Sequence, residues 1–316
     1  MASETKTILY QDVFGIIYTD YSIKRLTGED VDPGLDPATG VSSKDVVINP
    51  STGLYARLYL PINPSSSSSS NEQKLPLLVY YHGGGFFAES PKSPHYHYYL
   101  NLLSSEAQMA IVSVGYRLAP VYRLPIAYED SWEALQWAVG GGNNSEPWLL
   151  DHVDPSRLFL AGDSSGANIC HNLAMRDPKL FNIEGVVIVH PHFFLTGARP
   201  FEPWQLQLFE KYWVCIYPAS ASKGLEDPSI NPLATGAPSL KGLACNRVLV
   251  CQAENDFLHD QGKTYYDGLI QSGWVGTSPP EFFETLGEGH VFHLTNLDSE
   301  KAKEMMKIVV AFLNYK

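Results

Sequence analysis

Cysteine is scarce in this chain, because 316 residues contain only four and no two of them form a C-x-x-C pair. The four are Cys170, Cys215, Cys245 and Cys251, and three of them fall in apolar stretches that predict strands or helices. Cysteines scattered in this way favour reduced thiols in a hydrophobic core. The sequence therefore argues against a disulfide framework.

Positive charge is also scarce, with 22 Lys and Arg against 34 Asp and Glu and a net charge of −12. Nucleic acid and anionic membrane surfaces attract clustered Lys and Arg, so we expect neither as a main partner. No uninterrupted apolar run is long enough to cross a bilayer. The mixed-charge segment 1–6 leads into no signal-peptide core. We expect a cytoplasmic monomer or homodimer that acts on a small molecule.

Signatures of bound metals and cofactors are missing as well. The sequence contains no cluster of His, Cys, Asp and Glu with metal-ligand spacing. It contains no glycine loop of the P-loop or dinucleotide-binding type. We therefore predict no metal and no cofactor.

Short apolar runs alternate with helical stretches, which predicts an α/β fold with a mostly parallel central sheet and helices on both faces. The predicted strands lie at 45–48, 54–60, 75–81, 110–114, 158–161, 186–189, 248–251 and 281–285, the first two as an antiparallel edge pair. The predicted helices lie at 96–107, 128–139, 167–176, 204–214, 264–272 and 299–313.

The remaining segments suggest how this body is covered. We predict one domain over residues 1–316, because no linker or internal repeat interrupts it. Residues 1–40 are turn-rich and predict an irregular arm that either caps the body or covers a sheet edge. The serine run 65–70 predicts a surface loop, and the aromatic stretch 193–218 predicts an inserted cap.

One predicted strand leads through Gly162-x-Ser164-x-Gly166 into a helix, which is the pattern of a nucleophile elbow. The elbow places a hydroxyl on a sharp turn, where the flanking residues must be small because strand and helix approach closely. The N-terminal N–H groups of the helix favour negative charge nearby. Ser164 is therefore the candidate nucleophile, although the five-residue pattern also occurs as an ordinary polar turn.

Three consecutive glycines follow the strand at 75–81, in the sequence His82-Gly83-Gly84-Gly85-Phe86. Such a run suggests that the backbone must approach something closely. An oxyanion hole is the obvious candidate, built from the N–H groups of Gly84, Gly85 and Ser165. A merely flexible loop is the alternative.

A serine nucleophile needs a histidine base and an acid that orients it, in the chain order Ser, acid, His. His290 follows the strand at 281–285 and precedes the last helix, with His293 as its competitor. Asp256 follows the strand at 248–251, with Glu254 and Asp260 as competitors. We predict a triad of Ser164, Asp256 and His290.

With these motifs the chain resembles the plant carboxylesterase family of hormone-sensitive-lipase-type α/β-hydrolases, from about residue 23 to the C-terminus. The matching motifs are 82–86, 116–120 with 124–130, 162–168, and the loops of Asp256 and His290. Phrases at 40–45, 146–150 and 271–274 resemble the 2-hydroxyisoflavanone dehydratase branch. Many members carry an acidic residue and a histidine where this chain has Val121 and Tyr122.

The resemblance implies a serine carboxylesterase that hydrolyses an ester of a small plant specialised metabolite. The family also includes dehydratases, alkaloid-processing enzymes and gibberellin receptors, so two alternatives stay open. One is a lyase or cyclase that uses the same site. The other is a receptor without catalysis, which the presence of His290 disfavours because the gibberellin receptors lack that histidine.

Aromatic residues near the motifs suggest a pocket for a flat, polycyclic substrate. Most aromatic residues belong to the core, and that is the alternative for each of them. The candidate pocket residues are Phe86, Phe87, Phe193 and Trp213.

Overall fold

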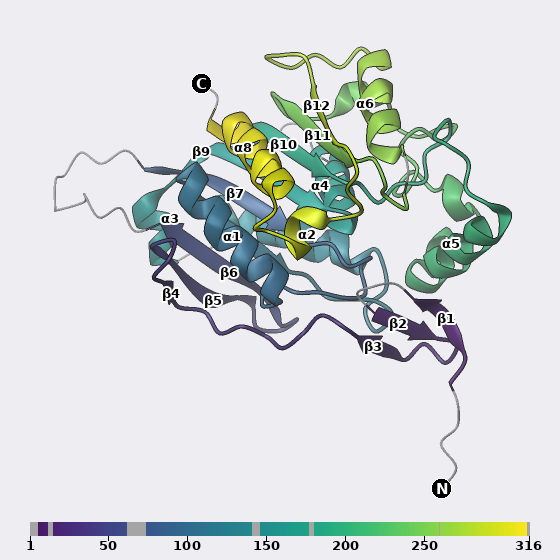
Figure 1. The fold of residues 1–316 in the computed structure, drawn as a ribbon, viewed down its shortest axis with the longest axis horizontal. Coiled ribbons are helices and arrows are strands. Elements are labelled where there is room, and N and C mark those ends of the chain that lie inside the picture. Colours follow the sequence, from purple (N-terminus) through teal and green to yellow (C-terminus); the bar gives the residue numbers. More distant parts are fainter. Residues whose placement is uncertain are drawn as a thin grey trace, which may run out of the picture.

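Among the residues that the computed structural model describes, nine strands form a sheet in the middle of the molecule (Figure 1). The order of its strands is β12-β11-β10-β9-β7-β8-β6-β5-β4. Their bounds are β4 Leu35–Asp36, β5 Val41–Asn49, β6 Leu54–Pro61, β7 Leu75–Tyr81, β8 Ala110–Gly115, β9 Val153–Asp163, β10 Ile183–Val189, β11 Val248–Ala253 and β12 Glu281–Thr285. The structure describes residues 6–11, 15–61, 74–140, 146–176, 180–258 and 260–314.

The six strands from β12 to β8 are parallel, whereas β6, β5 and β4 are antiparallel. All six residues of β8 and all six of β11 are buried. Helices cover both faces of such strands, which is why they are apolar throughout instead of alternating. The parallel sheet brings the carboxyl ends of β7, β9, β11 and β12 to one edge, where polar loop residues gather.

Helices α1 and α8 pack against each other on one face of the sheet, and α2 and α4 on the other (Figure 1). Helices α1 and α5 begin earlier than predicted, at Pro94 and Pro203, because proline suits the first turn of a helix. The bounds are α1 Pro94–Ala107, α2 Ile126–Ala138, α3 Pro147–His152, α4 Ser165–Arg176, α5 Pro203–Ile216, α6 Gln261–Gln271, α7 Phe292–Thr295 and α8 Glu300–Asn314.

The N-terminal arm is more regular than predicted. It contains a three-stranded antiparallel sheet of β1 Ile8–Gln11, β2 Gly15–Tyr18 and β3 Ile23–Arg25, which lies beside α5 (Figure 1). The ring of Tyr10 lies 4.7 Å from that of Tyr212 on α5 and 5.9 Å from that of Phe87. The strands β1 to β3 therefore pack against α5, while β4 forms one edge of the main sheet. The serine run 65–70 lies outside the described residues.

The state of the cysteines and the lengths of the helices match two expectations from the sequence. All four cysteines are free; Cys170, Cys215 and Cys251 are buried and Cys245 is half-buried. Among the described residues, no helix is both long and apolar enough to cross a membrane.

Candidate active site

Ser164 lies on the turn between β9 and α4, with a φ of +51°. A serine rarely adopts this left-handed conformation, and a sharp strand-to-helix turn requires it. The Ser164 N–H donates to the Val189 carbonyl at 2.9 Å, and its own carbonyl accepts from the His192 N–H at 3.0 Å. The end of β10 and the loop that follows it therefore hold the elbow from its other side.

The glycines of the elbow have no space for a side chain. A Cβ on Gly166 would collide with the Tyr81 carbonyl, and one on Gly162 would collide with the backbone of Gly166. Both obstacles are backbone atoms, which cannot turn aside as a flexible side chain can. The close approach inferred from the sequence is therefore the reason why both positions are glycine.

His290 and Asp256 form a hydrogen-bonded chain with Ser164. The Asp256 Oδ2 atom lies 2.7 Å from His290 Nδ1, and His290 Nε2 lies 3.0 Å from Ser164 Oγ. Asp256 follows β11, and His290 lies between β12 and α7. Ser164 and His290 are 126 positions apart in the sequence, and the fold brings both of them next to each other and to Asp256.

The electrostatics of Asp256 match an ion-pairing role. Burial alone would raise the pKa of this carboxyl, but the charge and the hydrogen bond of His290 outweigh it and leave the pKa below its usual value. Asp256 Oδ1 also accepts the Leu258 N–H at 2.8 Å. A carboxylate held at both oxygens fixes the orientation and tautomer of the histidine that it contacts.

The competing candidates lie elsewhere. Glu254 accepts the Gly287 N–H at 2.7 Å, so it anchors the loop that carries His290. Asp260 forms an ion pair with Arg199 at 3.3 Å. His293 is buried behind the loop, and neither of its ring nitrogens has a hydrogen-bond partner among the described residues.

The glycine loop lies against the start of α4. Gly84 and Gly85 have φ values of +87° and +57°, which favour glycine. No described residue accepts the N–H of either one. Ser165 is the first residue of α4, where an N–H has no acceptor within the helix. Its Oγ accepts the Phe86 N–H at 3.3 Å, so the loop and the elbow are in contact.

A buried network that the sequence did not reveal supports this loop. Tyr96 accepts the Gly83 N–H at 2.7 Å and donates to Asp163 at 2.8 Å, and Tyr80 donates to the other oxygen of Asp163 at 2.8 Å. Burial raises the pKa of Asp163 to about 6, although the two tyrosines oppose it. The motif residue Asp163 therefore links the elbow to the glycine loop.

The four predicted pocket aromatics are all completely buried. The ring centroids of Phe86 and Trp213 are 6.4 Å apart. Phe87 packs against the ring of Tyr212, whose hydroxyl donates to the Gly85 carbonyl. Phe193 stacks at 5.1 Å on Tyr265 of α6. Phe86 and Phe87 therefore pack beside the glycine loop. Phe193 instead packs against Tyr265 in the core.

His190, directly after β10, is a further residue of the site. Its Nδ1 accepts the Val291 N–H at 2.9 Å, which fixes the backbone next to His290. His190, Asp256 and His290 each offer a possible metal-ligand atom within 4.8 Å of the others. The Nδ1 atoms of both histidines already take part in hydrogen bonds, and a metal would compete with them. The absence of a metal stays a prediction.

Comparisons with known proteins agree with this geometry. A family model described as the α/β-hydrolase fold matches residues 78–294. "Probable carboxylesterase 2" of Arabidopsis thaliana is 43% identical over 308 residues, covering 95% of this chain and 94% of the relative. The chain belongs to the plant carboxylesterase family of α/β-hydrolases. This membership assigns the enzyme to the carboxylic ester hydrolases.

Other relatives extend the comparison. This esterase is 44% identical to the chloroplastic "Tuliposide A-converting enzyme 1" of Tulipa gesneriana, covering 99% of this chain and 79% of the relative. Among solved structures, the thermostable carboxylesterase EstE1 from a metagenomic library has a TM-score of 0.67 at 26% identity, covering 91% of this chain and 90% of that one. An arylesterase has a TM-score of 0.68 at 25% identity, covering 91% and 88%.

Proposed function

We propose that this esterase hydrolyses a carboxylic ester of a small aromatic or polycyclic plant metabolite, with Ser164 as nucleophile. The observation that carries the proposal is the continuous chain from Asp256 Oδ2 through His290 to Ser164 Oγ, with spacings of 2.7 and 3.0 Å. Both distances are within hydrogen-bond reach, as proton transfer requires.

The reaction follows from these contacts. Ser164 Oγ attacks the ester carbonyl while His290 Nε2 takes the hydroxyl proton, and Asp256 stabilises the resulting imidazolium. The carbonyl oxygen becomes an oxyanion that the N–H groups of Gly84, Gly85 and Ser165 can hold. The oxyanion collapses, the alcohol leaves with the proton from His290, and an acyl-serine remains. Water, deprotonated by His290, then releases the carboxylic acid.

The substrate class is a separate question from the reaction. The rings of Phe86, Phe87, Phe193 and Trp213 are completely buried against other residues, so as they lie here they lend the substrate class no support. One group of relatives converts tuliposide A, according to their names. The cytoplasmic location stays a prediction, because these relatives are named as chloroplastic or amyloplastic.

Turnover of a short-chain p-nitrophenyl ester tests the proposal. We expect Ser164→Ala and His290→Ala to lower kcat by roughly 10⁶-fold, as triad losses do in a comparable enzyme. Ser105→Ala on α1 and His152→Ala at the exposed end of α3 are matched controls and should stay active. A fluorophosphonate should label Ser164 and no other serine.

The outcomes separate the two enzyme hypotheses. Loss of turnover in both variants, with both controls active, supports the proposal. A folded parent protein that neither turns over the ester nor accepts the label would contradict it and favour a lyase or cyclase at the same site.

A further inference from the structure

An exposed aromatic ring lies beside the candidate base. The ring centroid of Phe257 is 4.6 Å from that of His290, and the two rings meet at 65° in a T-shaped contact. Phe257 is 41% exposed, whereas the four aromatic residues that the sequence suggested for the pocket are completely buried. Single exposed apolar side chains are common on protein surfaces. The position of this ring next to the base, and not its exposure alone, therefore needs an explanation.

The backbone on both sides of Phe257 is anchored. The Asp256 N–H donates to the Ala253 carbonyl at 3.2 Å, and Asp256 Oδ1 accepts the Leu258 N–H at 2.8 Å. Leu258 itself is buried in the core. The carboxyl group that contacts His290 therefore also fixes the turn that carries Phe257. The ring and the base keep their relative positions before any substrate arrives, which lowers the cost of ordering them on binding.

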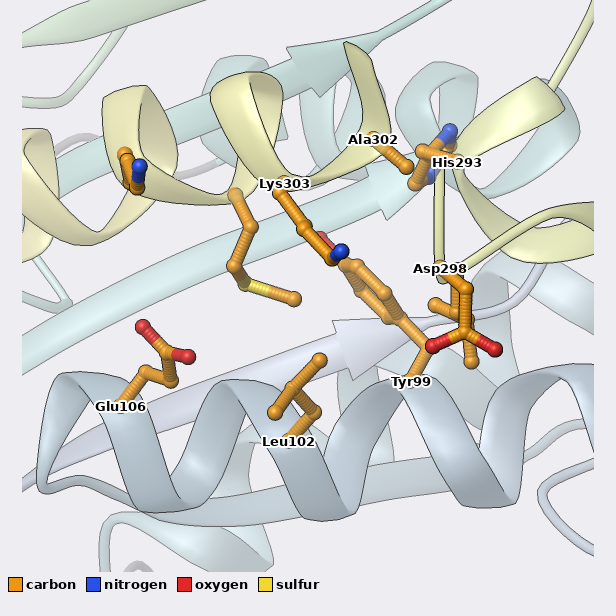
Figure 2. Close-up of a pocket in the computed structure, with 10 residues that line it drawn as sticks. Tyr99, Leu102, Glu106, His293, Asp298, Ala302 and Lys303 are labelled. Atoms are coloured by element: carbon orange, nitrogen blue, oxygen red, sulfur yellow. The ribbon is translucent and has the colours of Figure 1, made fainter. Parts of the chain in front are cut away.

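The side of His290 that is next to His190 is closed. The ring of His190 lies 6.0 Å from that of His290, and the ring of His293 lies 5.4 Å from that of His190. Both neighbours are 2% exposed. Figure 2 shows His293 with Tyr99 of α1 in the wall of the pocket between α1 and α8. A substrate cannot reach His290 through these packed side chains, whereas solvent reaches the side of Phe257.

The proposed reaction places the alcohol half of the ester beside His290. His290 Nε2 returns its proton to the oxygen of the departing alcohol, so that oxygen must come within about 3 Å of Nε2. The carbonyl oxygen of the same ester points instead to the N–H groups of Gly84 and Gly85. The carbon atoms attached to the alcohol oxygen therefore begin next to His290, where the exposed ring of Phe257 lies.

We propose that Phe257 determines specificity for the alcohol half of the ester, and that it selects an alcohol with an aromatic ring that packs on the exposed part of Phe257. Two aromatic rings gain from edge-to-face or offset contact in addition to the apolar area that they bury. The inference rests on the proposed ester hydrolysis and adds the chemical class of the alcohol. Substitution of Phe257 leaves the three side chains of the candidate triad in place.

Hydrolysis of two isomeric esters tests the proposal. Benzyl acetate carries its ring on the alcohol half and methyl phenylacetate carries it on the acyl half, so the two esters contain the same atoms. The readout is the ratio of their kcat/KM values, because a general disturbance of the triad lowers both values together. We expect Phe257→Ala to lower the ratio of benzyl acetate to methyl phenylacetate roughly tenfold relative to the parent.

Three more variants sharpen the test. Phe257→Tyr keeps the ring and should keep the parental ratio. Phe257→Leu keeps apolar bulk without the ring and should lower the ratio severalfold. Leu150→Ala is the control, because Leu150 is 52% exposed on α3, which precedes the start of β9, whereas Ser164 follows its end. This control should leave the ratio unchanged.

The outcomes separate the inference from the proposed function. An unchanged ratio in Phe257→Ala, or a larger loss for methyl phenylacetate, would overturn the inference while ester hydrolysis itself stood. A parental ratio in Phe257→Leu would overturn the selection of an aromatic alcohol. A parent protein that hydrolyses methyl phenylacetate but not benzyl acetate would also overturn it. A parent protein that hydrolyses neither ester and no p-nitrophenyl ester would contradict the proposed function.

Discussion

Replacing Asp256 by asparagine should disable the candidate triad with little change in shape. In the native site Oδ1 accepts the Leu258 N–H at 2.8 Å and Oδ2 faces His290 Nδ1 at 2.7 Å. The Leu258 N–H needs an acceptor, so the amide oxygen of the asparagine should stay beside it. The NH₂ group then faces Nδ1, which must act as acceptor. The ring proton moves to Nε2, and His290 can no longer accept the proton of Ser164.

The size of the effect follows from this wrong tautomer. In a serine protease the same change lowers kcat by about 10⁴-fold, or roughly 5 kcal/mol of transition-state stabilisation. We expect a similar loss in kcat for p-nitrophenyl ester hydrolysis at neutral pH, with KM changed much less. Glu254→Gln is the matched control, because the glutamine oxygen can still accept the Gly287 N–H.

The reasoning about Asp256 has clear points of failure. If Asp256→Asn keeps more than about a tenth of the parental kcat, Asp256 does not set the tautomer of His290. If Glu254→Gln loses as much activity as Asp256→Asn, the acid of the site has been misidentified.

Three further predictions concern stability and the loop. Tyr96→Phe leaves the Gly83 N–H without its acceptor, so we expect about 2 kcal/mol lower unfolding free energy and a lower kcat; an equal effect of Tyr98→Phe, at an exposed position, would refute this. Gly166→Ala forces a Cβ against the Tyr81 carbonyl, so we expect urea denaturation to show an unfolding free energy lower by about 3 kcal/mol or more. Gly242→Ala is the control and should change it little, because only Met175 lies near that Cβ, at 3.8 Å. Acid should destabilise the fold, because burial lowers the pKa of five histidines from 6.5 to about 3 or 4, so only the unfolded chain takes up their protons as the pH falls below 6.5. These histidines are His82, His97, His171, His190 and His192. Together they should remove several kcal/mol of unfolding free energy between pH 7.5 and 5.5, whereas Asp163, with its pKa raised to about 6, returns at most about 1 kcal/mol; equal urea midpoints at the two pH values would contradict this.

The local sequence was sufficient to predict the bounds of strands that are short apolar runs with clear ends. The predicted strands over 75–81 and 281–285 have the observed bounds, because apolar runs with clear ends specify them. The strand predicted at 158–161 extends from Val153 to Asp163, since its polar first half pairs with β7. The N-terminal strands were missed because pairing with one another and packing on α5 stabilise them, and a local pattern does not show either contact.

The sequence by itself determined the α/β class, and it predicted an elbow at Ser164 and a triad in the order Ser, Asp, His. Small residues at a tight turn and polar residues after apolar strands are local patterns that a sequence shows directly. Only the tertiary structure decided what each polar side chain contacts. It placed Asp256 within hydrogen-bond distance of His290. Glu254, two residues earlier, instead accepts the Gly287 N–H. It also buried both ring nitrogens of His293 without a hydrogen-bond partner among the described residues. These outcomes depend on distances of a few ångströms between segments far apart in the chain, and only the packing of the sheet and its helices sets them.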